Sequence, residues 1–290
     1  MQRGPVTPKG FGDIYPKEAA KRRKMFNAVI PILEKYGFQP LETPTVEFAE
    51  TLLGKYGEDE KLIYQFEDKG GRKLALRYDL TVPLARFVAN NLGLLDPTFS
   101  RYQIGQVFRG ENPQKGRRRE FTQFDFDTVG VKSPEEDAKI IACAIDSARA
   151  LGFKKAALMI NDRKNFEGLT IDEIRTIDKM YKIGRENIPQ KLLDFIDKTK
   201  PTQELTETFK ILKTNYGVIE GKDYIFDPTL ARGLDYYTGT IFEMKLNGRP
   251  EELTIGGGGR YDNLIGMFTG RSIPAVGFSF GIDRIIDLLS

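Results

Sequence analysis

The sequence predicts an α+β fold, in which helices pack on an antiparallel or mixed sheet. Candidate strands dominate the middle of the chain, hairpin turns join several of them, and amphipathic helices stand near both ends. The chain has 290 residues, 40% of them hydrophobic and 29% charged, which suffices for one large domain or two small ones with a real core. No apolar run approaches the roughly 20 residues that span a bilayer.

The first part of the chain begins with a helix and continues with short strands. Apolar residues recur at helical spacing between Phe26 and Leu33, so we expect a helix that follows Pro16 and ends near Gly37. Thr81 is a residue type that caps helices, and apolar residues follow it. The later elements expected here are an extended segment over 38–46, a hairpin with strands at 62–66 and 73–78, and a helix over 81–91.

The next part of the chain predicts two strands, a helix and a third strand. Residues 102–109 and 121–130 are typical of strands on either side of a basic loop. Ser133 is followed by Pro134 and, at the third position, by Glu136, which is the pattern of a capping box with proline in the first turn. We therefore expect a helix from Ser133 to about Leu151, followed by a short buried strand over 156–160.

Residues 165–221 differ in character, because they contain several polar helical patterns between two strand-rich regions. We interpret them as a helical insertion subdomain. The fold thus divides into a core made of 1–164 and 222–290, with 165–221 inserted. After the insertion we expect strands at 224–227, 236–246, 252–257 and 275–281, a glycine run at 256–259, and a last helix over 282–289.

The absence of histidine excludes several chemistries. The chain has no histidine and one cysteine, Cys143. A serine–histidine or cysteine–histidine nucleophile, a histidine base and a histidine-bound metal are therefore excluded. One cysteine also excludes an internal disulfide, and the N-terminus has no apolar signal core, so we expect a reducing cytoplasm. Any catalysis depends on carboxylates, arginines, lysines, tyrosines, backbone dipoles or hard cations.

Positive charge is concentrated in one segment. The chain carries 44 basic and 41 acidic residues, an excess of three, and residues 109–120 alone carry five basic and two acidic ones, the same excess. Such a cluster suits contact with phosphate or nucleic acid. Taken alone, the cluster is more typical of a solvated hairpin loop.

The strand at 121–129 places different chemistry on its two faces. Phe124 and Phe126 share one face, whereas Gln123, Asp125 and Asp127 share the other. The polar face can hold two ends of a small polar substrate, or it can be a plain solvent-facing edge.

Three arginines stand beside glycine-rich or turn segments. Arg109 ends a strand, Arg232 lies in a string with two tyrosines, and Arg284 falls in the first turn of the last helix. Guanidinium groups bind phosphate through paired hydrogen bonds, helix N-termini attract anions, and four glycines at 256–259 leave backbone against which a base or ribose can lie. Each feature has a structural alternative: local salt bridges for Arg109 and Arg284, a tight turn for the string with Arg232, and a flexible loop for the four glycines. Together these features suit nucleotidyl transfer, which depends on positioning and charge neutralisation.

The order of these motifs resembles the catalytic core of class II aminoacyl-tRNA synthetases, and specifically that of the histidyl-tRNA synthetase family. The resemblance covers nearly the whole chain, from about Gly10 to the final helix. Its strings are motif 1 at 37–44, motif 2 at 108–111 and 121–124, motif 3 at 277–284, two histidine-specific strings at 232–237 and 257–262, and a substrate loop at 77–81.

The resemblance implies an antiparallel six-stranded sheet flanked by helices, and a homodimer that forms through motif 1. It implies that the protein activates histidine with ATP to form histidyl-adenylate and then transfers histidine to the 3′ end of tRNA-His. Mg²⁺ would bridge ATP oxygens, and the protein side chains alone would not form a metal site. The resemblance implies no membrane partner. Family members continue past motif 3 into an anticodon-binding domain, which this sequence does not include.

The resemblance also implies roles for individual residues. Arg232 and Arg109 would act in catalysis at the α-phosphate, and the helical insertion would clasp the tRNA acceptor stem. ATP would be bound by Arg109, Glu111 and Arg284. Histidine would be bound by Asp79, Thr81, Gln123, Asp127, Arg232, Tyr236, Tyr237 and Tyr261. The tRNA acceptor end would be met by Gln114, Lys115 and Arg117.

A non-catalytic relative is the alternative. The regulatory subunit of ATP phosphoribosyltransferase resembles the same core but tends to lose the residues that handle ATP. Because Arg109, Arg232 and Arg284 are all present here, the sequence favours the enzyme.

Overall fold

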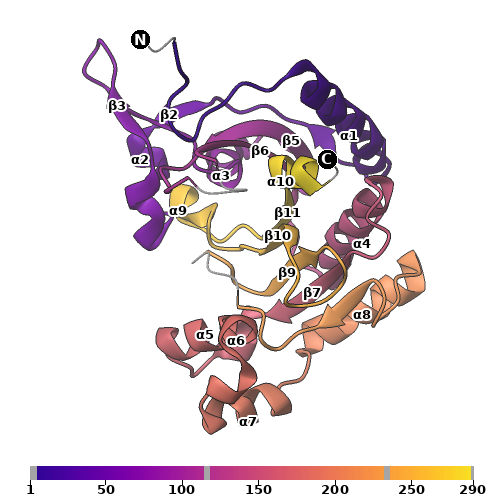
Figure 1. Cartoon of the computed structure of the whole chain (residues 1–290). Helices are drawn as coiled ribbons and strands as arrows, with labels where there is room; N and C mark the ends of the chain where they lie inside the picture. Colours follow the sequence, from indigo (N-terminus) through magenta and orange to yellow (C-terminus); the bar gives the residue numbers. More distant parts are fainter. Residues whose placement is uncertain (1–4, 114–117, 232–235, 289–290) are drawn as a thin grey trace.

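The computed structural model describes residues 5–113, 118–231 and 236–288, and its fold is α+β, as predicted (Figure 1). Within these ranges the main sheet has eight strands instead of the six expected, in the order β1-β5-β6-β11-β10-β9-β7-β8. The six inner strands pair antiparallel throughout, and the two extra strands are short edge pieces that pair in parallel with β5 and β7. Their bounds are β1 Gln39–Pro40, β5 Phe99–Phe108, β6 Glu120–Val129, β7 Ala157–Asp162, β8 Tyr224–Phe226, β9 Thr240–Lys245, β10 Thr254–Arg260 and β11 Ala275–Gly281.

One face of the main sheet is covered by helices that bury the largest core. Figure 1 shows α1 (Pro16–Lys35), α4 (Pro134–Ala150) and α8 (Gln203–Tyr216) along one side of the sheet, with α10 (Ile282–Leu288) next to β11. Phe124, Phe126 and Phe278 project into this core from the strands. Ser133 caps α4 by accepting from the backbone N–H of Glu136 at 3.4 Å, as expected. The Glu136 carboxylate, however, lies 2.8 Å from Nζ of Lys139.

A second, smaller sheet and several short helices lie beyond the opposite face and form a separate apolar cluster. The cluster covers β5 and the end of β6 and bounds one side of the pocket described below. The small sheet has the order β2-β4-β3. The elements here are β2 Val46–Phe48, β3 Gln65–Glu67, β4 Lys73–Leu76, α2 Ala49–Leu52, the 3₁₀ helix Gly57–Leu62, α3 Thr81–Asn91 and α9 Gly266–Thr269.

The start of α3 differs from the prediction that Thr81 caps it. Thr81 is the first residue of the helix, and Asp79 performs the capping: its Oδ1 accepts from the backbone N–H groups of Thr81 and Val82 at 3.1 and 3.0 Å. A carboxylate two residues before the helix reaches the free N–H groups of the first turn and also suits the positive end of the helix dipole.

Residues 165–221 are helical, as expected. They contain α5 (Ile171–Asp178), α6 (Met180–Ile183), α7 (Gln190–Lys198) and α8, and the 3₁₀ helices Arg163–Phe166 and Arg185–Asn187 lie beside them. Figure 1 shows α5, α6 and α7 gathered beside one end of the sheet, where they share an apolar cluster with β7 and β9. In contrast, α8 packs on α4 in the main core. The division of the chain at 165 and 221 stays a prediction.

The glycine run is strand, although one interpretation of the sequence was a loop. Residues 256–259 lie within β10 and pair on both sides, with β11 and with β9. A Cβ at Gly258 would collide with the carbonyl group of Gly277 and the ring of Phe242. The glycines therefore permit close packing inside the sheet.

The strand predicted over 236–246 is shorter in the structure, since β9 begins at Thr240. Over the described ranges, none of the helices combines the length and apolarity needed to cross a membrane.

Candidate active site

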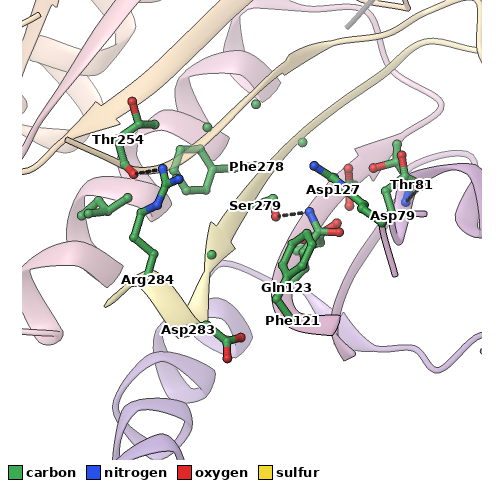
Figure 2. Close-up of a pocket in the computed structure, with 18 of the residues that line it drawn as sticks. Asp79, Thr81, Phe121, Gln123, Asp127, Thr254, Phe278, Ser279, Asp283 and Arg284 are labelled. Carbon is green, nitrogen blue, oxygen red and sulfur yellow. Dashed lines mark hydrogen bonds between the residues drawn. The ribbon is translucent and has the colours of Figure 1, made fainter. Parts of the chain in front are cut away.

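One cavity of about 330 Å³ lies over the polar face of β6, β10 and β11. Its walls include all of the predicted ATP- and histidine-binding residues that the structure describes: Asp79, Thr81, Arg109, Glu111, Gln123, Asp127, Tyr236, Tyr237, Tyr261 and Arg284. Four predicted site residues, Arg232, Gln114, Lys115 and Arg117, lie outside the described residues. Figure 2 shows Asp79, Thr81 and Asp127 at one end of the pocket and Arg284 at the other, with Gln123 and Ser279 between them.

The first end of the pocket is built from carboxylates above a buried arginine. Asp127 accepts a hydrogen bond from the Tyr261 hydroxyl at 2.6 Å, and its other oxygen lies 2.8 Å from Nη2 of Arg101, whose side chain is 0% exposed. Asp125, two residues earlier on β6, is buried at the same face. Asp79 is also buried, and its Oδ1 accepts from the Tyr56 hydroxyl at 2.9 Å.

These carboxylates are held where ionisation is unfavourable. Burial raises the pKa of Asp125 to about 7, with Arg101 lowering it and Asp127 raising it further. Burial likewise raises the pKa of Asp127, against the opposing charge of Arg101, and the pKa of Asp79, against hydrogen bonds from Val82 and Tyr56. A cation bound at this end of the pocket would favour the ionised forms of these carboxylates, so the site suits a cationic ligand.

Tyrosines form the wall beside the carboxylates. The rings of Tyr236 and Tyr261 meet edge to face at 5.9 Å between centroids, and Tyr236 and Tyr237 do so at 5.0 Å. Burial, followed by the charge of Asp127, raises the pKa of Tyr261 well above its ordinary value, so its hydroxyl stays a neutral donor. The wall combines flat apolar surface with phenol groups and suits a small aromatic ring that carries N–H groups.

Two arginines that line the pocket, Arg109 and Arg284, are held by aromatic and backbone contacts. The Arg109 guanidinium lies 4.3 Å from the ring centroid of Tyr78 and 5.1 Å from that of Phe121, and its Nε donates to the Tyr78 carbonyl at 3.2 Å. Arg284 donates from Nη1 to the carbonyl of Thr254 at 2.8 Å. These contacts orient both guanidinium groups and leave further N–H donors for an anion.

Glycine at position 277 allows β11 to pack closely against the side chain of Asp127. Gly277 on β11 pairs with Asp127 on β6, and a Cβ at Gly277 would overlap the Asp127 carboxylate. The Asp127 side chain therefore lies directly over the neighbouring strand. A larger residue at Gly277 would push this carboxylate away from both Tyr261 and Arg101.

Several residues of the site were not assigned a role from the sequence. The alternation of residues 121–129 placed Asp125 on the correct face, so this pattern could have identified it as a site residue. Arg101 gave no signal, because its partner Asp127 is 26 positions away and meets it only when β5 pairs with β6. Tyr56 and Asp283 were also missed. Asp283 bridges Arg22 of α1, at 2.5 Å, and the backbone N–H of Thr122, at 2.6 Å.

The described residues do not themselves contain a protein metal centre. Over 5–113, 118–231 and 236–288, no group of three or more acidic or cysteine side chains is arranged to hold a metal ion. The arginines and the acidic end are the charged features of the pocket, and both suit organic ligands that bring their own charge.

Comparisons with known proteins identify the family. The sequence model of the family described as Histidyl-tRNA synthetase matches residues 10–175 and 173–285. A histidine–tRNA ligase from Aeropyrum pernix is 44% identical over 98% of this chain and 74% of its own length. The crystal structure of histidyl-tRNA synthetase from Nostoc sp. PCC 7120 superposes with a TM-score of 0.86 at 31% identity and covers 99% of this chain and 76% of that one.

A third similarity concerns the fold alone. A protein from Bacillus halodurans described as an ATP phosphoribosyltransferase regulatory subunit/histidyl-tRNA synthetase has a TM-score of 0.82 at 22% identity, over 98% of this chain and 83% of its own. The family match and the identities above confirm the resemblance seen in the motifs and the expected enzyme class. The chain belongs to the histidyl-tRNA synthetase family of aminoacyl-tRNA ligases.

Proposed function

We propose that this protein activates histidine with ATP to form histidyl-adenylate and then transfers histidine to the 3′ end of tRNA-His. The observation that carries the proposal is the charge distribution of the pocket: buried carboxylates and phenols stand at one end, Arg284 stands at the other, and Arg109 also lines the pocket. An amino acid with a cationic head fits the first end and a polyphosphate the second. The two reactants would meet between them, over Gln123 and Ser279.

In the proposed first step, an oxygen of the histidine carboxylate attacks the α-phosphorus of ATP. The new oxygen–phosphorus bond forms as the bond to the leaving pyrophosphate breaks. Arg109 would hold the α-phosphate and Arg284 the γ-phosphate, while Glu111 lies near the adenine. Fixed guanidinium groups stabilise the charge that gathers in this transition state at little reorganisation cost. Arg232 would assist at the α-phosphate, a role taken from the family motif.

The same end of the pocket would select histidine. Asp79, Thr81 and Gln123 would bind the amino group, and Asp127 with three tyrosines would shape the imidazole pocket. The tyrosines are Tyr236, Tyr237 and Tyr261. The Tyr261–Asp127 hydrogen bond of 2.6 Å supports this assignment, because it fixes a carboxylate next to an aromatic wall. Neither step requires a histidine of the enzyme.

The remaining parts of the proposal concern the partners. Gln114, Lys115 and Arg117 would meet the tRNA acceptor end, and the helices within 165–221 would clasp the acceptor stem. Mg²⁺ would neutralise the ATP phosphates when bound, and no described cluster competes to hold it. We also propose that the protein works in the cytoplasm as a homodimer formed through motif 1.

The regulatory alternative has weaker support. Similarity to the Bacillus halodurans protein at 22% identity concerns the fold, whereas Arg109 and Arg284 are both present and both line the pocket. A protein that only sensed histidine would have no need of these two arginines.

The decisive measurement is histidine-dependent exchange of pyrophosphate into ATP, with the folded chain shown to bind histidine by calorimetry. Exchange well above the rate without histidine supports the enzyme. Histidine binding without exchange would reject the enzyme and favour a regulatory relative.

A further inference from the structure

Three acceptor atoms on the polar face of β6 are buried without a hydrogen-bond donor among the residues that the structure describes: Oε1 of Gln123, Oδ1 of Asp125 and Oδ2 of Asp127. Oδ2 of Asp127 lies in an ion pair with Arg101, so Gln123 and Asp125 are the two that remain. The side chains stand at alternate positions on the same strand face, roughly 7 Å apart along the backbone. Both line the pocket. Burying an acceptor without a partner is costly, so such atoms indicate a ligand that supplies donors.

Asp127, the next residue on this face, differs because its carboxylate has a paired opposite charge. One of its oxygens accepts from Tyr261, and the other is in the ion pair with Arg101. Arg101 forms its ion pair with Asp127. Asp125 is only 2% exposed, and the charge of Arg101 and the Ser279 hydroxyl lower its pKa without cancelling the rise that burial causes.

Asp79 supplies another acceptor in the same pocket. Its hydrogen bonds within the described chain, from Tyr56, Thr81 and Val82, all fall on Oδ1. Its Oδ2 is the remaining oxygen of a carboxylate that lines the pocket. Asp79 and Asp125 are close enough for the charge of each to act on the other.

The number, kind and charge of these acceptors fit a primary ammonium group. An ammonium has three N–H donors and one positive charge, and it needs three acceptors that face a common point. Asp79, Gln123 and Asp125 offer one each, and the carboxylates at this end suit a cation. A neutral ring N–H would satisfy one acceptor and leave the charges unbalanced.

We propose that Asp125 binds the ammonium group of the amino acid substrate, as the third acceptor beside Asp79 and Gln123, and that Asp127 acts on the imidazole side. The proposal rests on the proposed function, because it assumes that an amino acid occupies this end of the pocket. It adds a residue to the set that the family motifs assign.

In this proposal, Asp125 contributes to ligand specificity and lowers the stability of the protein when no ligand is bound. Without a ligand, its charge is buried beside two other carboxylates. Replacement by asparagine keeps the size of the side chain and removes the charge. Asp125→Asn should therefore weaken binding of ammonium-bearing ligands and at the same time raise the melting temperature. If Asp125 had only a structural role, its replacement would change the ligand affinity and the melting temperature in the same direction.

The test uses three ligands with the full chain and with Asp125→Asn. Histidine has ammonium, carboxylate and imidazole; histidinol lacks the carboxylate; 3-(imidazol-4-yl)propionate lacks the ammonium. Calorimetry, with competition for weak ligands, should show that the variant binds histidine and histidinol at least about tenfold more weakly, as expected for a lost charged hydrogen bond. Its affinity for the propionate should stay within about twofold.

Asp137→Asn is the matched control, because Asp137 is a buried carboxylate outside the pocket that pairs with Arg260. This variant should lose melting temperature without changing the ratio of histidine to propionate affinity. Equal weakening of all three ligands by Asp125→Asn, or unchanged histidine affinity, would overturn the proposal. If the unaltered chain binds histidine but performs no pyrophosphate exchange, the proposed function fails while the ammonium site stands.

Discussion

At the scale of single residues, the site depends on side chains that the fold holds in place before any ligand binds. Arg109 shows how. Its guanidinium is fixed by the rings of Tyr78 and Phe121 and by the Tyr78 carbonyl. Its planar group can thus stack on aromatic surface and still present donors to a phosphate. Lysine keeps the charge but has neither the plane nor the paired donors.

Arg109→Lys should therefore slow adenylation strongly while the fold is kept. We expect a loss in the exchange rate of roughly 100-fold, typical of removing one preorganised donor from a transition state. Histidine affinity, measured by calorimetry, should change much less. Arg72→Lys is the control, since Arg72 forms an exposed pair with Asp68 far from the pocket. Similar rates for both variants would show that Arg109 does not act at the phosphate.

Asp125 also predicts a dependence of stability on pH. Burial raises its pKa in the folded chain from 3.8 to about 7, so the folded state holds this proton more tightly than the unfolded chain. Its contribution is most favourable below the unfolded pKa and is lost as the pH rises through about 7. Asp79 and Asp127 face it as like charges, Arg101 as the opposing one, and Ser279 as a donor.

The free energy of unfolding of the unaltered chain, relative to Asp125→Asn, should therefore fall by a few kcal/mol between about pH 4 and about pH 8. Urea denaturation of both proteins at several pH values measures this difference. Asp79 and Asp127 also have raised pKa values, and comparison with Asp125→Asn removes most of their contribution. A difference that does not change with pH, or that rises with it, would contradict the prediction.

At the scale of helices and strands, the central feature is a strand made largely of glycine. β10 pairs on both sides, and its glycines bring the two neighbouring strands and their side chains into close contact. A Cβ at Gly258 would meet the Gly277 carbonyl and the Phe242 ring. Any side chain there must push strands apart within a close-packed core.

Gly258→Ala should destabilise the protein by roughly 2 kcal/mol, which is typical of overpacking. Gly93→Ala is the matched control, because a Cβ at Gly93 meets nothing within 4 Å and its backbone is not left-handed. The control should leave stability nearly unchanged. Urea denaturation of the two variants tests the strand directly, since in a flexible loop the alanine at 258 would be as harmless as the one at 93.

The same strand illustrates what the sequence can predict. Periodicity located the helices and long strands well, because each follows from the side chains of its own segment. It placed Gln123, Asp125 and Asp127 on one face of β6, as observed. It predicted the first part of β10, at 252–257, but not its continuation through Arg260, since glycine carries no periodic signal. It also could not predict the Arg101–Asp127 pair, which forms only after β5 and β6 align. The strand predicted at 224–227 is β8, whereas β1, with two residues, lies in a segment predicted only as extended.

At the scale of the whole molecule, the small sheet β2-β4-β3 leaves an apolar face uncovered. The register aligns Phe48, Leu74 and Phe66 in one row, and Val46, Phe48 and Phe66 are 39%, 50% and 43% exposed. Exposed apolar side chains gathered on one sheet face are typical of an interaction surface. Motif 1, at residues 37–44, runs directly into β2. This face is therefore our candidate for the contact between two copies of the chain.

Phe48→Glu should shift the protein from dimer to monomer, because a carboxylate in this row would be buried without a partner in the dimer. Light scattering after size-exclusion chromatography, over a range of protein concentrations, measures the mass directly. Ile171→Glu is the control, since Ile171 is 68% exposed on α5, in the helical insertion. We expect the control to stay dimeric. If the unaltered chain is a dimer and Phe48→Glu leaves it so, another surface joins the two copies.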